Sequence, residues 1–185
     1  MTHDELRLAI REAAYLEGDF LLRSGKRSRY YLDKYRFETR PDLLAALGEV
    51  IAGAVADSAP DATRLACPEL GAVALAAATS LASGLPFVIV RGAAKEYGTA
   101  NRIEGAYERS ESVCLVEDIV TSGGALLETV AALRDVGLEV ATAVCVVDRE
   151  EGGGEALARE GVGLRPIFRA SDLLEAPKIP AKPHG

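Results

Sequence analysis

Two adjacent carboxylates, Glu117 and Asp118, stand between an apolar run that begins at Val113 and a Thr-Ser-Gly-Gly turn at residues 121–124. A continuous apolar run is typical of a buried strand in a parallel sheet, so we expect the carboxylates at its carboxyl end. Ligands of open α/β sheets bind at that edge. Carboxylates can bind sugar hydroxyls, and glycines before a helix let backbone N–H groups converge on an anion. The segment therefore predicts a sugar phosphate site.

The rest of the chain predicts the elements that would position this segment. Apolar stripes with helix caps indicate helices near residues 2–13, 41–55, 72–83 and 125–136. Short apolar or β-branched runs indicate strands near residues 20–22, 30–32, 64–67, 87–90, 113–117, 140–147 and 164–168. The first two strands should form a hairpin. Because the later strands alternate with helices, we expect an α/β fold with a mainly parallel central sheet flanked by helices.

Composition excludes several classes of function. The net charge of −7 argues against a nucleic-acid partner, and no apolar run is long enough to span a membrane. The amino terminus has no basic segment followed by an apolar run, so we expect no secretion signal. The cysteines are three and widely spaced, which indicates reduced core residues. Both histidines, His3 and His184, lie at the chain ends, where a histidine-based catalytic or metal site is not expected.

Other phosphate motifs do not explain the 113–125 segment. The chain has no Gly-x-x-x-x-Gly-Lys-Ser/Thr sequence, which excludes a P-loop, and no Gly-x-Gly-x-x-Gly follows a strand. One alternative is an ordinary turn between a strand and a helix, with Asp118 or Ser122 as the helix cap. The functional interpretation is favoured because paired carboxylates, hydroxyls and glycines occur together at the predicted edge.

The 113–125 segment resembles the phosphoribosyl pyrophosphate (PRPP) motif of the type I phosphoribosyltransferases. The resemblance implies that Asp118, and with it Glu117, acts catalytically by holding the ribose hydroxyls while positive charge develops on the ring. It also implies Mg²⁺, held mainly by PRPP oxygens and water and not by a protein carboxylate cage. The PRPP-binding residues implied in this segment are Glu117, Asp118, Ile119, Val120, Thr121, Ser122, Gly123, Gly124 and Ala125.

Residues 92–105 follow a predicted strand, have no clear periodicity and carry charges and glycines. With Arg91 they resemble the mobile catalytic loop of the orotate phosphoribosyltransferases. The resemblance implies a lid in which Arg91, Lys95 and Tyr97 contact PRPP, with Lys95 acting on the pyrophosphate that leaves. Two positions depart from the family pattern: Gly92 replaces a common lysine, and Tyr97 replaces a common histidine. The alternative is a solvated charged loop.

Residues 18–35 resemble the hood of the same enzymes, which covers the base. The resemblance implies that Arg23 and the Tyr31 ring contact orotate, together with Thr121. An exposed basic hairpin turn is the alternative for this segment. Because Arg23 stands where the family has a lysine, its role depends on position and not on identity.

Arg149 follows a predicted strand, where these enzymes place an arginine that meets the base. A guanidinium there can pair with the orotate carboxylate or bond its carbonyl groups. The alternative is a surface ion pair with Glu150 or Glu151, which would contribute little. The turn at residues 68–71 corresponds to the pyrophosphate turn of the family, where some members carry a lysine near Gly71 and this chain does not.

The resemblance extends from Phe20 to Phe168 and implies a type I phosphoribosyltransferase fold in one domain, residues 1–176, with a tail at 177–185 that we expect to lack order. The implied reaction transfers ribose 5-phosphate from PRPP to orotate and gives orotidine 5′-monophosphate and pyrophosphate. A cytoplasmic homodimer that shares lid residues is expected. The alternatives are transfer to another base, such as a purine, and a PRPP-sensing regulator. The short acidic chain offers no evident DNA-binding element for the second.

Overall fold

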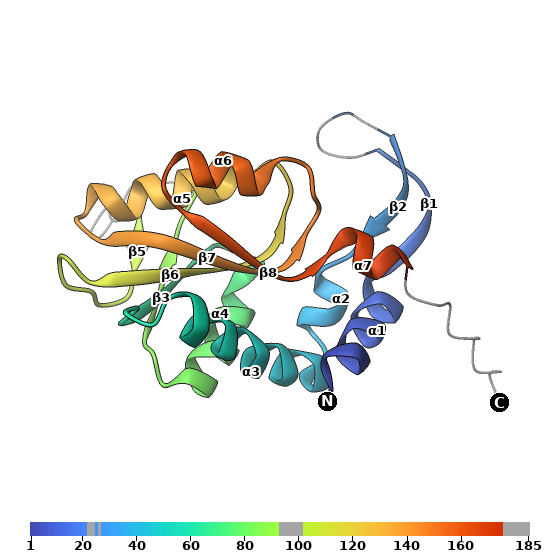
Figure 1. Ribbon diagram of the computed structural model, residues 1–185, viewed down its shortest axis with the longest axis horizontal. Coiled ribbons are helices and arrows are strands. Elements are labelled where there is room, and N and C mark those ends of the chain that lie inside the picture. Colours follow the sequence, from blue (N-terminus) through green and yellow to red (C-terminus); the bar gives the residue numbers. More distant parts are fainter. Residues whose placement is uncertain (22–24, 26, 93–101, 176–185) are drawn as a thin grey trace.

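A computed structural model describes residues 1–21, 25, 27–92 and 102–175, and it is built around a six-stranded sheet (Figure 1). In spatial order the strands are β5 (Ile103–Glu104), β4 (Phe87–Val90), β3 (Arg64–Pro68), β6 (Ser112–Val120), β7 (Glu139–Asp148) and β8 (Gly163–Arg169). Neighbouring strands are parallel except for β5, which is antiparallel to β4. The predicted fold class, an α/β domain with a mainly parallel sheet, is confirmed.

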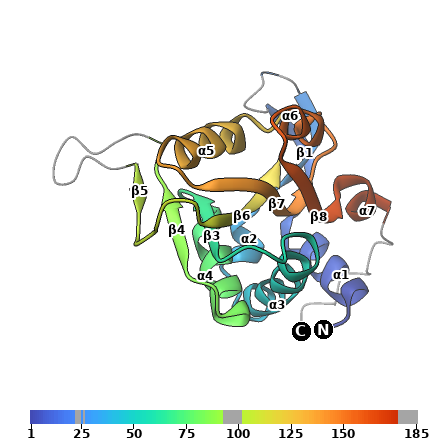
Figure 2. The same cartoon turned by 60° about the vertical axis from the view of Figure 1, so that its left-hand side comes forward.

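Helices cover both faces of this sheet (Figures 1 and 2). α3 (Pro41–Ser58) and α4 (Ala72–Ser83) lie on one face, and α5 (Gly124–Asp135) and α6 (Gly153–Arg159) lie on the other. Each face has its own apolar core, with Leu47, Ile51 and Leu75 on the first and Leu126 and Leu133 on the second. The buried β6 contributes to both, which explains its continuous apolar sequence.

The amino-terminal segments form a smaller unit beside the carboxyl edge of the sheet (Figure 1). It contains α1 (His3–Ala14), the antiparallel strands β1 (Tyr15–Leu21) and β2 (Arg27–Leu32), and α2 (Tyr35–Glu38). Thr2 and Glu5 form the predicted capping box, and the predicted hairpin is confirmed. β1 is longer than expected because it begins directly after α1. The one-turn α2 and the short α7 (Ala170–Glu175) were not predicted, since such short helices show no periodicity.

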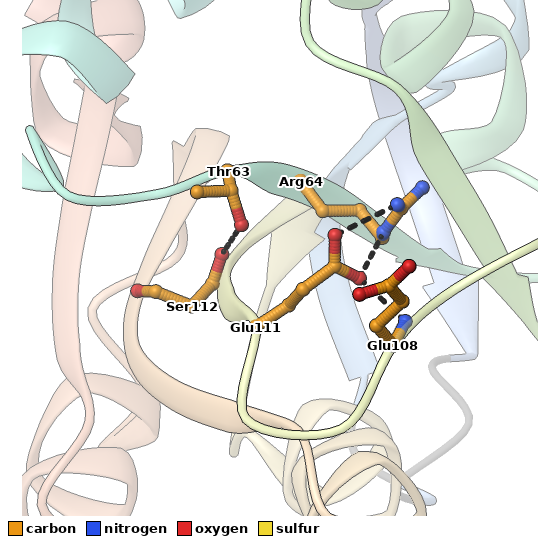
Figure 3. Close-up of polar contacts among 5 residues, drawn as sticks. All are labelled: Thr63, Arg64, Glu108, Glu111 and Ser112. Carbon is orange, nitrogen blue, oxygen red and sulfur yellow. Dashed lines mark hydrogen bonds and ion pairs between the residues drawn. The ribbon is translucent and has the colours of Figure 1, made fainter.

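A partly buried ion pair joins β3 and β6 at the opposite end of the sheet, where both strands begin (Figure 3). Both nitrogens of the Arg64 fork donate to Glu111, at 2.8 and 2.9 Å, and the Glu108 backbone N–H donates to the same carboxylate at 2.8 Å. These bonds, with the Arg64 bond first, lower the pKa of Glu111 to about 2. The pair is therefore part of the scaffold, remote from the edge that carries the predicted site.

All three cysteines are buried free thiols, as predicted. Burial raises the pKa of Cys67 and of Cys114 to about 12, so these thiols stay protonated. Within the described residues, every helix is too short or too polar to cross a membrane. The expected tail at 177–185 lies outside the described residues.

Candidate active site

The carboxyl ends of four parallel strands meet at one edge of the sheet. Val120 at the end of β6 pairs with Asp148 at the end of β7, and Pro68 on β3 pairs with Val90 on β4. The segments that follow these residues are therefore neighbours. They are the 69–71 turn, Arg91, the 121–124 turn and Arg149. The structure thus brings together segments that the sequence analysis selected separately.

A cavity of about 460 Å³ lies at the turn between β6 and α5. The turn enters α5 through Gly123, which has a left-handed φ of +82° and provides no side-chain cap. Hence neither Asp118 nor Ser122 caps the helix, and the helix cap expected in the alternative interpretation is wrong. The first N–H groups of α5 have no partner within the helix, as at any helix start, and can bind an anion. The residues that line the cavity are Glu117, Ile119, Val120, Thr121, Ser122, Gly123, Gly124, Ala125, Leu126 and Glu128.

A second glycine supports this turn from outside. A Cβ atom at Gly153, the first residue of α6, would lie 2.5 Å from the Thr121 carbonyl oxygen and 2.5 Å from Val120 Cγ1. A Cβ atom at Gly123 would lie 3.1 Å from the Gly153 carbonyl oxygen. The backbones of the two turns therefore pack directly against each other. The shape of the cavity therefore depends on Gly153, which lies about 30 positions after the 121–124 turn in the sequence.

The two carboxylates do not mark the end of their strand, which corrects the sequence analysis. β6 continues through Glu117 and Asp118 to Val120, and the two residues are only 6% and 2% exposed. Successive strand residues point to opposite faces, so Glu117 lines the cavity while Asp118 faces the side of α2. Burial, and then the charge of Asp118, raises the pKa of Glu117 to about 8. The pair is therefore enclosed, which the apolar pattern alone does not indicate.

Two residues of the amino-terminal unit that the sequence analysis did not select contact Asp118. Lys34 Nζ donates to Asp118 Oδ2 at 2.6 Å, and the buried Glu38 of α2 lies beside the same carboxylate. Burial, followed by the charge of Asp118, raises the pKa of Glu38 to about 8. The only signal for these contacts in the sequence is that Glu38, a charged residue, stands next to the apolar Phe37, and both are buried on the single turn of α2.

Arg91 lies at the end of β4, next to the turn that follows β3. Its guanidinium is 3.7 Å from Glu69 and 3.5 Å from Glu104, and Glu69 also accepts the Gly92 backbone N–H at 3.1 Å. Arg91 Nε is buried and makes no hydrogen bond within the described residues. Residues 92–105, predicted as a continuous loop, contain the short strand β5 near their end. Arg91 is therefore held beside the 69–71 turn that follows β3.

Arg149 is at the end of β7 and is 9% exposed at its side chain. It pairs with Glu151 at 3.0 Å, and its guanidinium lies 5.5 Å from the centre of the Tyr30 ring. Among the residues that the structure describes, its buried Nε has no hydrogen-bond partner. The alternative of an ion pair with Glu151 is thus observed: the Arg149 side chain is nearly buried, whereas the Glu151 side chain is 43% exposed. A buried guanidinium with an unused donor is a suitable partner for a planar anion.

A tyrosine that the sequence analysis did not select, Tyr30, contacts Arg149. Tyr30 faces Arg149, whereas Tyr31 is on the opposite side of β2, 42% exposed and 5.6 Å from the Phe20 ring. The alternation of β2, with Leu32 buried, was a sequence signal for Tyr30. Three other predicted site residues, Arg23, Lys95 and Tyr97, lie outside the described residues, as does most of the predicted lid.

Comparison with known proteins agrees with this geometry. Residues 36–167 match the family described as "Phosphoribosyl transferase domain". An orotate phosphoribosyltransferase of Halobacterium salinarum is 51% identical over 174 residues, which is 94% of this chain and 97% of that protein.

Solved structures show the same similarity. The orotate phosphoribosyltransferase of Aeropyrum pernix is 31% identical with a TM-score of 0.82, covering 95% of this chain and 97% of its own. The enzyme of Mycobacterium tuberculosis in complex with PRPP is 31% identical with a TM-score of 0.78, covering 92% of this chain and 98% of its own. The similarity therefore includes both the hood and the sheet.

Proposed function

The chain belongs to the phosphoribosyl transferase family and, within it, to the orotate phosphoribosyltransferases, and we propose that its carboxyl edge carries out their reaction. It transfers ribose 5-phosphate from PRPP to orotate and produces orotidine 5′-monophosphate and pyrophosphate, a step of pyrimidine biosynthesis. The observation that carries this assignment is the cavity at the β6–α5 turn, which lies between Arg149 and the 69–71 turn at one edge of the sheet.

The 5′-phosphate of PRPP binds in this cavity. The Thr121 and Ser122 hydroxyls and the open N–H groups at the start of α5 supply donors, and the helix dipole favours an anion there. With the phosphate fixed, the ribose extends along β6 towards Glu117 and Asp118. This anchoring orients the reacting ribose carbon between the base and the leaving group.

The two carboxylates serve the ribose. As pyrophosphate departs, positive charge develops on the ring, and a nearby negative charge stabilises that transition state more than the ground state. Asp118 carries this charge, because Lys34 pairs with it. Glu117 is a hydroxyl partner on the cavity side. Its pKa of about 8, raised mainly by burial, keeps it protonated at neutral pH and able to donate a hydrogen bond.

The pyrophosphate lies next to the 69–71 turn and Arg91, with Lys95 as the residue that closes over it. Mg²⁺ is held mainly by PRPP oxygens and water. The local carboxylates suit this arrangement, because Glu117 accepts the Asp118 backbone N–H at 2.9 Å and both Asp118 oxygens already accept hydrogen bonds. When bound, Mg²⁺ supplies positive charge to the leaving group. Arg91 adds a cation on the protein side.

Orotate lies between the ribose and Arg149. The Arg149 guanidinium binds the orotate carboxylate, which requires it to exchange its pair with Glu151 for the ligand. The Tyr30 ring packs against the Arg149 guanidinium, and Thr121 forms a hydrogen bond with the edge of the base. Arg23 and Tyr31 remain proposed contacts of orotate. We also propose a cytoplasmic homodimer whose lid residues reach the partner's site.

The test is an assay of the purified protein with PRPP and Mg²⁺ and, in separate reactions, orotate, uracil, hypoxanthine, xanthine or adenine. We expect product with orotate and with none of the other bases, because only orotate has a carboxylate that can pair with the Arg149 guanidinium. Use of a purine would retain the family and overturn the base assignment. Binding of PRPP without turnover on any base would instead indicate a PRPP-sensing protein.

A further inference from the structure

Both oxygens of the Asp118 carboxylate accept hydrogen bonds from the protein itself. Oδ1 accepts the Ile119 backbone N–H at 2.5 Å, and Oδ2 accepts Lys34 Nζ at 2.6 Å. The Asp118 side chain is 3% exposed, whereas Lys34 is 31% exposed. Lys34 therefore covers the open side of a buried carboxylate, and it comes from the segment just before α2, not from the sheet.

Two more buried carboxyl groups share this environment. Glu117 precedes Asp118 on β6, and Glu38 projects from α2 with Oε1 buried and without a hydrogen-bond partner in the described residues. Asp33 adds negative charge near Glu38, and the neighbouring Cys145 thiol of β7 is neutral because burial holds its pKa well above its ordinary range. Burial and the charge of Asp118 also hold the pKa of Glu38 and of Glu117 near 8. One ammonium group thus faces three carboxyl groups.

The ion pair also packs closely against the turn after β3. A Cβ atom at Gly71 would lie 2.0 Å from Asp118 Oδ2 and 2.4 Å from Lys34 Nζ. The ion pair therefore fills the space that a side chain at residue 71 would need. Burial alone would lower the pKa of Lys34, but the Asp118 carboxylate outweighs it and raises that pKa above its ordinary value. Lys34 is consequently charged throughout the neutral range.

We propose that Lys34 is a positioning residue that selects Asp118, and not Glu38 or Glu117, as the ionised carboxylate presented to the ribose. This inference rests on the proposed function. A buried cluster of carboxyl groups cannot ionise fully, and the cation decides which member keeps the negative charge. Since Lys34 donates to Asp118 at 2.6 Å, that charge stays on the residue next to the reacting ring.

The test compares pH profiles of kcat/KM for Lys34→Met and Lys34→Arg. Loss of an opposite charge at this distance raises a carboxyl pKa by about 1–3 units. The acid limb of Lys34→Met should therefore move to higher pH by that amount. Lys34→Arg retains the charge and should keep the limb near its original pH. Arg36→Met, which removes an exposed cation from the same helix turn, is the matched control.

A second comparison separates selection of the charge from simple support of the fold. Glu38→Gln removes one competitor for the negative charge, so the double variant Lys34→Met/Glu38→Gln should recover part of the activity that Lys34→Met loses. Lys34→Gln, which keeps a hydrogen-bond donor without the charge, should show the same shifted limb and serves if the methionine variant does not fold. Melting temperatures of all variants check folding.

Three results would overturn the inference. An acid limb that is the same in Lys34→Met, or in Lys34→Gln, and the starting protein would show that Lys34 does not control ionisation of Asp118. A gain in turnover on removing Lys34 would show that it blocks the ribose instead. No recovery in the double variant would exclude competition with Glu38. Failure of the proposed function is distinct, because the starting protein would then transfer ribose phosphate to no base.

Discussion

The substitution Gly153→Ala tests whether the two packed glycine turns shape the phosphate site. Its Cβ atom would lie 2.5 Å from the Thr121 carbonyl oxygen, whereas ordinary contacts of such atoms begin at 3.4 Å. The β6–α5 turn and α6 must therefore separate by about 0.9 Å, the difference between these distances. Overpacking of this kind costs about 1–3 kcal/mol of stability. A displacement near 1 Å at a positioning element reduces turnover by about 100-fold.

The control is Gly154→Ala, one residue further along α6, where the new Cβ atom would meet only Leu164 Cδ2 at 3.8 Å. That change should keep activity and add about 0.5–1 kcal/mol of stability, since alanine favours a helix. The assays are urea unfolding, PRPP binding by calorimetry and kcat/KM. Gly153→Ala should lose PRPP affinity together with turnover. If it behaved like Gly154→Ala in all three assays, contact between these turns would not shape the site.

Three other predictions follow from the described contacts. Arg149→Ala should raise the Kd of orotate about 10- to 150-fold, the effect of losing a charged hydrogen bond, and leave PRPP binding unchanged; the exposed Arg165→Ala is the control, and a loss of PRPP binding in place of orotate binding would contradict the assignment. Glu111→Gln should lose about 1–3 kcal/mol of stability at pH 7, unlike Glu108→Gln, which keeps its backbone donor. Because the folded pKa of Glu111 is about 2 and its ordinary value is 4.5, that difference should vanish in urea unfolding as the pH falls from 4.5 to 2. The pH dependence of Glu38 has the opposite sign: its folded pKa is about 8, so the starting protein loses stability as the pH rises from 4.5 to 8. The melting temperature of Glu38→Gln should therefore exceed that of the starting protein by a margin that is absent at pH 4.5 and grows as the pH rises to 8.

The sequence was sufficient to predict the five parallel strands of the central sheet, but not the short antiparallel strand β5. The strand at 87–90 and the helix at 72–83 agree with the structure at both ends, because Pro86 and Gly84 bound them by backbone chemistry. The end of β6 was wrong by three residues. Charged residues usually mark the end of a buried strand, but here the Lys34–Asp118 ion pair and the raised pKa of Glu117 favour keeping two carboxyl groups inside it.

Only those parts of the candidate site that directly follow a strand in the sequence were predicted. The 121–124 turn, Arg91 and Arg149 each follow a parallel strand, so the pairing of strands alone brings them together. Lys34 could not be selected in this way. Its role depends on how the amino-terminal unit docks on the sheet edge, which has no local pattern.

Gly153 illustrates the same limit. In the sequence it is the middle residue of a three-glycine run that indicates a loop, but in the structure it is the first residue of α6. Its requirement for glycine comes from the approach of the Thr121 carbonyl oxygen, a contact between segments about 30 residues apart. Tyr30 is the converse case, because alternation along β2 could have selected it before Tyr31.

The central claim is that the β6–α5 turn binds the 5′-phosphate of PRPP, and a crystal structure of the protein with PRPP and Mg²⁺ tests it most directly. The account predicts the phosphate within hydrogen-bond distance of the Thr121 and Ser122 hydroxyls and the first N–H groups of α5, with the ribose hydroxyls towards Glu117 and Asp118. A phosphate bound at the other glycine turn, residues 152–154, with the β6–α5 cavity left empty, would contradict it.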